Sequence, residues 1–215
     1  HHMFTVGMPI AGELYFMYAT MLIAVPTGVK VFNWITTMYK GSLTFETPML
    51  FSIAFVILFT FGGFTGLMLS IAAADIQYHD TDFVFAHFHY VMVAGAVFSG
   101  TAAVYYWLPK WCGKMYDETM GKVQFWIAFI GFNITFMPQH FLGLAGMPRR
   151  YADYGLQFAD WNMVSSIGAF MYGAAQILFL FNVVRTITHG KPVDKPEVWE
   201  GAEGLEWTVP TPAPY

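Results

Sequence analysis

Four stretches of this chain contain no Asp, Glu, Lys or Arg, and each is longer than the roughly 20 residues that a helix needs to cross a membrane. They are residues 47–74, 83–109, 123–148 and 161–184. A fifth stretch, at about 12–38, is apolar apart from Glu13 and Lys30. Lipid offers the backbone no hydrogen-bond partner, so segments that cross it must be helical.

The sequence therefore predicts an all-α membrane protein. Its five transmembrane helices are expected at about 12–38, 47–71, 82–110, 120–143 and 160–188. Charged residues make up only 11% of the 215, against about 25% in soluble proteins, and this shortage agrees with a chain surrounded by lipid.

The basic residues of the connections divide unequally between the two sides of the membrane. One side carries Lys40, Lys110, Lys114, Lys122, Arg185, Lys191 and Lys195. The other carries only Arg149 and Arg150, near Asp75, His79 and Asp80. Because the lysine-rich side of a membrane protein usually lies in the cytoplasm, we expect the HD pair (79–80) and the RR pair (149–150) to face outward.

Both ends of the chain differ from the apolar middle. Residues 190–215 are rich in Pro and Glu and carry most of the chain's net charge of −4, so we expect a polar, solvated tail. The chain begins with His1 and His2 ahead of its first Met. From residues alone, this pair indicates either a tag remnant or an internal break in a longer protein. The single cysteine, Cys112, excludes a disulfide within the chain.

Two histidines, His87 and His89, lie inside the third apolar stretch, in "HDTDFVFAHFHYV" (79–91). A helix turns about 100° per residue, so these side chains point to opposite sides of it. They cannot converge on one metal, but they suit two cofactors that flank the helix, and haem can be held by one axial imidazole. The alternative is a pair of core histidines that are hydrogen-bonded across the bundle. Ionisable groups inside a membrane are usually functional, which favours ligation.

Lys30 lies deep in the first apolar stretch, in "VPTGVKVFNW". A lysine at this depth costs about 2.5–3.5 kcal/mol on insertion scales, and desolvation eases the loss of its proton. It is therefore a candidate proton relay, with extension of the side chain toward the interface as the alternative. Pro26 and Gly28 should loosen this helix and free backbone groups for water or for Thr27, which favours a hydrated path.

Arg149 and Arg150 lie on the side that is otherwise poor in basic residues, in "GMPRRYADY" (146–154). Arginine binds carboxylates through two parallel hydrogen bonds, and haem propionates are such carboxylates. Pairing with Asp153 or Asp160 is the alternative.

Seven motifs in register resemble the catalytic subunit of the haem–copper oxidases, above all subunit I of the bacterial aa3-type cytochrome c oxidases. They are "HHMFTVGM", "AVPTGVKVFNW", "FETPMLF", "GGFTGLML", "HDTDFVFAHFHYV", "PQHFLGLAGMPRRYADY" and "WNMVSSIGAF". The resemblance implies the C-terminal portion of a bundle of about twelve helices. It also implies reduction of O2 to water with electrons from cytochrome c, coupled to proton translocation. A quinol-oxidizing relative is the nearest alternative. Asp80 and Tyr90 favour the cytochrome c oxidases over this alternative.

The resemblance assigns the histidines to redox centres. His1 and His2 would be native ligands of copper B rather than a tag. His87 would be the axial ligand of haem a3, and His89 one axial ligand of haem a.

The resemblance also implies residues for proton transfer and, on the outer side, residues for a metal site and for the haem propionates. Thr27 and Lys30 would belong to a proton channel, and His79 with Asp80 to a Mg²⁺ or Mn²⁺ site. The residues expected near the haem propionates are Asp75, Arg149 and Arg150.

Part of each redox site is not in these residues, because a third copper ligand and a second haem a ligand are expected from the helices that precede this portion. The expected partners are therefore the missing N-terminal portion of subunit I, in the same or a separate chain, subunit II with its copper centre, subunit III, cytochrome c and lipid. No nucleic acid is expected, and the expected location is a bacterial inner membrane rather than a mitochondrial one. Asp82 replaces the Tyr of the family motif, and we expect it to face solvent.

Other functions explain less of the sequence. "PTGVK" with Lys30 speaks against a nitric oxide reductase. A membrane scaffold or transporter would not account for seven motifs in order, and a simple di-haem carrier would leave His1 and His2 without a role.

Overall fold

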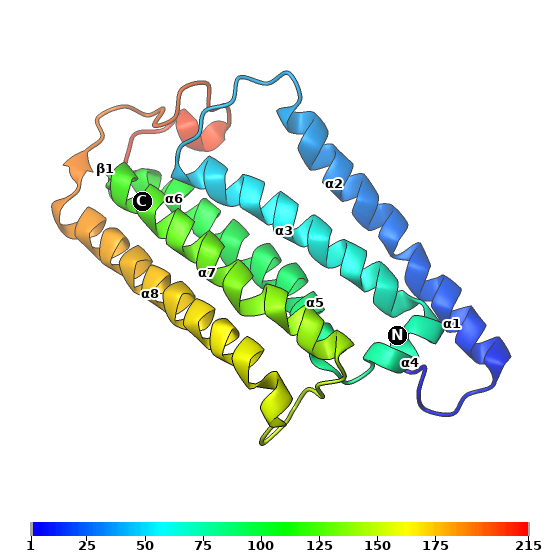
Figure 1. Ribbon diagram of the computed structural model, residues 1–215. Helices are drawn as coiled ribbons and strands as arrows, with labels where there is room; N and C mark the ends of the chain where they lie inside the picture. Colours follow the sequence, from blue (N-terminus) through cyan, green and yellow to red (C-terminus); the bar gives the residue numbers. More distant parts are fainter. Residues whose placement is uncertain (1, 215) are drawn as a thin grey trace.

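The computed structural model describes residues 2–214 as long helices that lie side by side (Figure 1). Five helical spans within this part of the chain are long and apolar enough to cross a membrane. They are Ile10–Met38, Thr47–Ser70, Asp82–Cys112, Glu118–Leu144 and Leu156–His189. The all-α architecture with five membrane helices is confirmed.

The first span is interrupted near its middle. It consists of α1 (Ile10–Leu22) and α2 (Ala24–Met38). Pro26 has no N–H to donate to the carbonyl four residues earlier, and the Thr27 hydroxyl donates to the carbonyl oxygen of Ile23 at 2.9 Å. The interruption lies at Ile23, three residues before Pro26, and the backbone there keeps helical angles, φ −62° and ψ −28°, so the helix is loosened locally rather than broken.

The second and third spans are joined by a short helix. The elements, in order, are α3 (Thr47–Ser70), α4 (Ala72–Tyr78), α5 (Asp82–Val93), the π-helical turn η1 (Ala94–Phe98) and α6 (Ser99–Cys112). The Thr81 side chain caps α5 by accepting a hydrogen bond from the Phe83 N–H at 3.3 Å. Such a cap satisfies one of the free N–H groups at a helix start.

The last two spans form an antiparallel pair. They are α7 (Glu118–Leu144) and α8 (Ala159–His189), the latter preceded by the 3-10 turn η2 (Leu156–Phe158). Gly131 and Gly168 let the two backbones approach, since a Cβ on Gly168 would lie 2.5 Å from the backbone nitrogen of Thr135. Small residues permit this kind of close helix packing in membranes.

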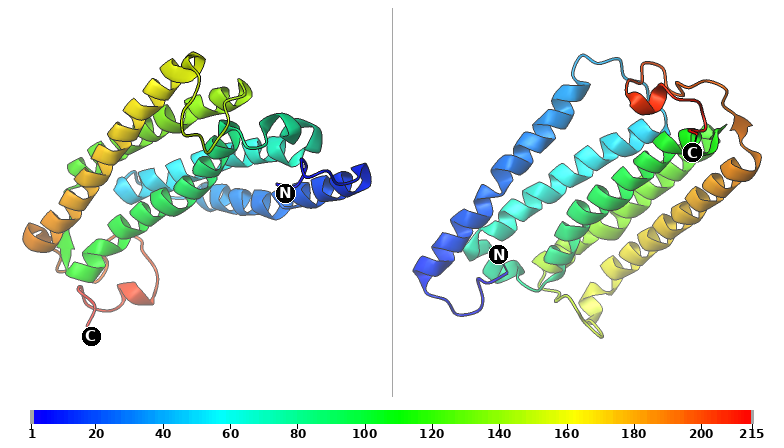
Figure 2. Two further views of the ribbon diagram at one scale, coloured as in Figure 1. Left: turned by 90° about the horizontal axis from the view of Figure 1, so that it is seen from below. Right: turned by 180° about the vertical axis from the view of Figure 1, so that it is seen from behind.

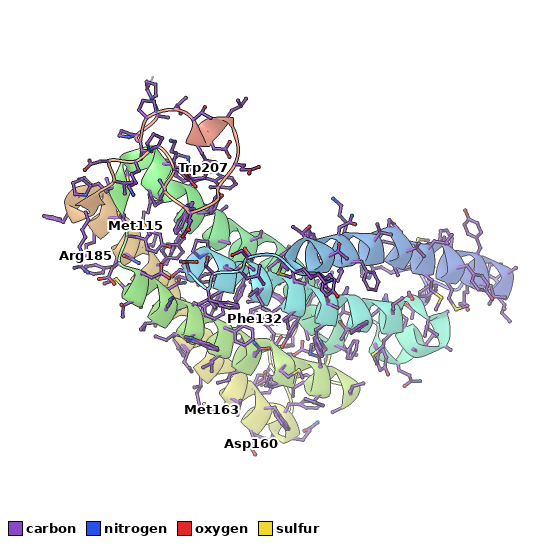
Figure 3. All side chains as sticks on the ribbon, turned by 90° about the horizontal axis from the view of Figure 1, so that it is seen from above. Met115, Phe132, Asp160, Met163, Arg185 and Trp207 are labelled. Carbon is purple, nitrogen blue, oxygen red and sulfur yellow. The ribbon has the colours of Figure 1, made fainter. Side chains whose placement is uncertain are left out.

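The helix α5 lies between α3 and α7 and contacts both, and α1–α2 forms one edge of the assembly (Figures 1 and 2). An aromatic core fills the space among α3, the third span and α7. Phe51, Tyr90, Phe98 and Phe132 are nearly fully buried there, and Phe132 lies near the centre of Figure 3. In contrast, α1 and α2 bury no side chain.

Most residues of the tail are exposed, but two of its elements pack against the helices. Its strand β2 (Lys191–Pro192) pairs with β1 (Lys114–Met115), and η3 (Leu205–Trp207) brings Trp207 against the end of α6, where it is 5% exposed. Figure 3 shows Trp207 at this end of the bundle. The Trp199 indole donates to the Tyr106 carbonyl at 2.8 Å and stacks on its ring. Aromatic side chains thus attach part of a segment whose overall composition indicated a polar, solvated tail.

Lys110 is the polar anchor of this tail. It is only 3% exposed. Its ammonium group donates to the carbonyls of Pro196 at 3.0 Å and Val209 at 2.7 Å and to the Thr211 hydroxyl at 3.0 Å. It also lies 5.6 Å from the centre of the Trp207 ring. All three hydrogen-bond donors of the lysine are therefore used by the tail.

Candidate functional site: two oriented histidines and an outer polar cluster

His87 faces α3. Its Nδ1 lies 2.8 Å from the Gly62 carbonyl oxygen and 3.1 Å from the Thr65 hydroxyl. A carbonyl oxygen can only accept, so Nδ1 donates and Nε2 carries the free lone pair. The ring fits because residue 66 is glycine: a Cβ there would lie 2.8 Å from Cε1 of His87.

His89 faces the other way, toward α7. Its Nδ1 donates to the Phe85 carbonyl at 2.7 Å, and its ring stacks on Phe136 with centroids 4.3 Å apart. Phe85 and Phe88 lie against the same ring at 4.2 and 4.4 Å. No hydrogen bond to Nε2 of either His87 or His89 occurs within residues 2–214. A bond at Nδ1 that leaves Nε2 available is the arrangement of an axial imidazole ligand.

A polar cluster lies at the end of the bundle opposite the tail. His79 Nδ1 is 3.4 Å from a carboxylate oxygen of Asp75, and His79 Nε2 is 3.5 Å from one of Asp80. Asp75 is only 4% exposed. Burial raises the pKa of Asp75 above its ordinary value, and the nearby His79 opposes that shift.

The two arginines are attached to this cluster. The Arg149 N–H donates to the Asp80 carbonyl at 2.8 Å, and the Arg150 guanidinium lies 3.8 Å from the Asp80 carboxylate. The Arg149 guanidinium lies over the Phe88 ring at 5.5 Å, with its Nε buried and without a hydrogen bond among the described residues. Pairing of either arginine with Asp153 or Asp160 is not found in this part of the chain.

The backbone of the cluster is constrained. Asp80 and Arg150 both adopt positive φ, 52° and 60°, and a β-bridge joins Thr81 to Pro148 beside them. Non-glycine residues in this region cost energy and concentrate at functional sites.

The metal ligand sets are not complete within residues 2–214, where no group of three or more His, Cys, Asp or Glu is placed to hold a metal ion. His1 lies outside the described residues. Desolvation lowers the pKa of His2 below 6.5, with smaller contributions that include Arg149 and His79, so His2 lies near the polar cluster at the end of the bundle opposite the tail. Both metal assignments therefore need ligands from elsewhere.

Thr27 and Lys30 lie one turn apart on the same side of α2. Lys30 is exposed, and Thr27 is partly exposed. The structure describes no partner for the Lys30 ammonium group within residues 2–214, so this face of α2 is open in the chain by itself.

Comparison with known proteins agrees with this arrangement. Residues 1–171 match the family described as "Cytochrome C and Quinol oxidase polypeptide I". The chain belongs to this family. It is 53% identical over its whole length to cytochrome c oxidase subunit 1 of Cereibacter sphaeroides and 53% identical to that of Bacillus sp. (strain PS3). It spans 38% and 35% of those relatives, so it corresponds to little more than a third of each.

The fold is also that of a solved oxidase. A heme-copper terminal oxidase dimer determined by cryo-EM superposes with a TM-score of 0.78 at 19% identity, covering 97% of this chain and 44% of that one. Membership in the oxidase family implies haem and copper as cofactors. The five apolar spans place the chain in a membrane.

Sequence reasoning missed His140, although the oxidase motif that contains it was identified. His140 lies in α7 and is 5% exposed. The rule that singled out His87 and His89, a histidine inside a charge-free stretch, applies equally to His140. The roles of Gly62, Thr65 and Gly66 around His87 were also not predicted, because they depend on the contact between α3 and α5.

The expectation that Asp82 faces solvent was wrong. Asp82 is 2% exposed, at the first turn of α5. Its N–H donates to the Met147 carbonyl at 3.0 Å, so the connection after α7 folds over it. A carboxylate in the first turn of a helix is favoured by the helix dipole.

Proposed function

We propose that this chain forms the C-terminal helices of the catalytic subunit of a terminal respiratory oxidase. In this proposal, the enzyme reduces O2 to water with electrons from cytochrome c and couples this reaction to proton translocation. The observation that carries the proposal is the pair His87 and His89, which face different helices, each with Nδ1 donating to a carbonyl oxygen and Nε2 available.

In this proposal His87 is the axial ligand of the oxygen-binding haem a3, and His89 is one axial ligand of the electron-delivering haem a. Bound haem and copper supply the electron transfer and oxygen binding that side chains cannot supply. The protein orients the imidazoles: the Gly62 carbonyl sets the His87 ring, and the Phe85 carbonyl with the Phe136 ring sets the His89 ring.

The outer cluster is proposed to serve the haem edges and a divalent cation. The buried, unpartnered Nε of Arg149 requires an acceptor, and a haem propionate has the right charge and geometry. Arg150 and Asp75 belong to the same proposed propionate environment. His79 and Asp80 provide one nitrogen and carboxylate oxygens for Mg²⁺ or Mn²⁺, with further ligands from outside this chain.

Proton supply and the copper site complete the proposal. Lys30 and Thr27, on the open face of α2, would line a hydrated proton path between this helix and the preceding part of subunit I. His1 and His2 would bind copper B together with a histidine from that part. Subunit II with its copper centre, subunit III and cytochrome c are the proposed partners.

The bacterial relatives favour the bacterial plasma membrane as the location. The family description names both cytochrome c and quinol oxidases, and the relatives at 52–53% identity are named cytochrome c oxidase. This similarity, together with Asp80 and Tyr90, supports cytochrome c over quinol as the electron donor.

The test uses the complex purified with its partner subunits. His89→Asn should remove the low-spin haem while the other haem still binds CO, and His87→Asn should remove CO binding. Lys30→Met should slow turnover with both haems retained. His189→Asn, at the exposed end of α8, is the matched control. A wild-type complex without stoichiometric haem and copper would refute the proposal.

A further inference from the structure

His140 is a buried histidine with no assigned role. It lies near the C-terminal end of α7, and both ring nitrogens are buried; within residues 2–214 the acceptors near the ring are the Phe136 and Met137 carbonyls of its own helix. Three aromatic rings surround it: Phe61 at 5.5 Å and 89°, Phe83 at 5.3 Å and 82°, and Tyr90 at 5.4 Å and 55° between ring planes. Two of the three contacts are edge-to-face.

These three rings belong to the two helices that orient His87. Phe83 and Tyr90 lie on α5, four residues before and three residues after His87, and so one turn away on either side. Phe61 lies on α3 next to Gly62, whose carbonyl oxygen accepts the hydrogen bond from His87 Nδ1. His140, on α7, therefore contacts both α3 and α5 at the place where these two helices pack together, which we call the α3–α5 joint.

The joint itself is tight. A Cβ on Gly62 would lie 2.9 Å from the Val91 side chain and 3.0 Å from Tyr90. A small displacement of Tyr90 or Phe61 would therefore change the separation of α3 and α5, and with it the hydrogen bond that orients His87. Tyr90 is also held by its hydroxyl, which donates to Asn133 on α7 at 2.9 Å.

The chemistry of the imidazole explains how His140 can contact α3 and α5 without a hydrogen bond to either helix. A buried N–H without any acceptor costs about 1–3 kcal/mol. The faces of aromatic rings are electron-rich, and they accept N–H groups weakly and favour edge-on neighbours. An imidazole has the more polar edge and the smaller ring, so it fits between three aromatic side chains where a larger ring would press them apart.

We propose that His140 is a positioning residue for the axial histidine His87: its ring, held among Phe61, Phe83 and Tyr90, sets the spacing of α3 and α5 and thereby the orientation of the His87 imidazole. This inference rests on the proposed role of His87 as a haem ligand. His140 itself touches neither haem nor substrate in this scheme.

The test is the iron–histidine stretching band of the reduced high-spin haem, measured by resonance Raman spectroscopy on the purified complex. His140→Leu removes the planar ring and should shift or broaden this band, while the absorption band of the low-spin haem stays in place. His140→Phe puts a larger ring among the same three aromatic side chains and should also shift the band, because it presses them apart. If the Leu variant does not assemble, His140→Met takes its place with the same expected shift, because Met adapts to irregular cavities.

The matched control is Phe136→Leu, one turn earlier on α7. It contacts His89 rather than the rings around His87, so it should change the low-spin haem and leave the iron–histidine band unchanged. A Leu or Met variant at 140 with an unchanged band would overturn the inference, as would equal changes in both haems. A wild-type complex without haem would instead overturn the proposed function, and this inference with it.

Discussion

Replacing Lys110 with methionine should release the C-terminal tail from the membrane helices. The ammonium group is buried at the end of α6 and gives all three of its hydrogen bonds to tail residues, at 2.7–3.0 Å. Methionine has nearly the same length and shape but no donor. The carbonyl oxygens of Pro196 and Val209 would lose this donor, and the contact with the Trp207 ring would lose its charge.

The size of the effect follows from these contacts. Hydrogen bonds to charged groups contribute about 1.5–3 kcal/mol each, and a buried acceptor left without a donor costs about 1–3 kcal/mol. The lysine no longer has to be desolvated in the variant, which offsets part of this loss. A net weakening of tail docking by about 2–4 kcal/mol corresponds to a rise of roughly 30- to 700-fold in the undocked population.

Amide hydrogen exchange on the purified complex measures this population directly. Exchange of the amides in 193–211 should accelerate by that factor in Lys110→Met, while the amides within α3 and α7 stay protected. Lys114→Met is the matched control, because Lys114 donates to the carbonyls of Ile187 and Thr188 at the end of α8 and not to the tail. Unchanged exchange in Lys110→Met, or equal acceleration in the control, would refute the assignment of Lys110 as the anchor.

Three further predictions concern the site and the helix ends. Gly66→Ala places a methyl group 2.8 Å from Cε1 of His87 and should lower the CO-binding haem content relative to the low-spin haem, measured by difference absorption. Asp80→Ala should remove bound Mn²⁺, followed by electron paramagnetic resonance, with both haems retained; unchanged Mn²⁺ would contradict the assignment. Asp117 accepts a hydrogen bond from the Met120 N–H, which lowers the pKa of this carboxyl below 3.8. The ionised Asp117 carboxylate stabilises the folded state fully above pH 3.8, and this contribution is lost as the pH falls through the lower folded-state pKa. Near neutral pH, Asp117→Asn should therefore unfold at a lower temperature than wild type. The difference between their unfolding temperatures should shrink in acid.

The number and kind of helices could be predicted because lipid imposes one dominant constraint. A segment without charged residues that is long enough to cross the hydrocarbon has helix as its only solution when it is not part of a closed barrel. The local loosening between α1 and α2 could also be predicted, because Pro26 removes a specific backbone hydrogen bond. The opposite directions of His87 and His89 follow from helix geometry alone. All three inferences use local sequence only.

What could not be predicted depends on residues far apart in the chain. Lys110 resembles an ordinary basic residue at a membrane boundary, and its acceptors lie in the tail beyond two more helices. The buried state of Asp82 follows from the connection after α7 folding back over the start of α5. The overall composition of the tail indicated a polar, solvated segment, and it gave no sign that two tryptophans would attach this segment by packing against Tyr106.

Under the proposed function, the uneven burial of the helices favours α1 and α2 as the contact with further helices of the subunit. The helix α7 buries many side chains against its neighbours, whereas α1 and α2 bury none. Lipid alone could cover the apolar side chains of α2, but it would offer no partner to Lys30, whose charge is costly in hydrocarbon. A face that combines Lys30 and Thr27 with apolar residues is better satisfied by other helices and water than by lipid. Under the proposed function, helices such as those in the remaining length of the relatives would cover this face, and the proposed proton path would run along their contact with α2.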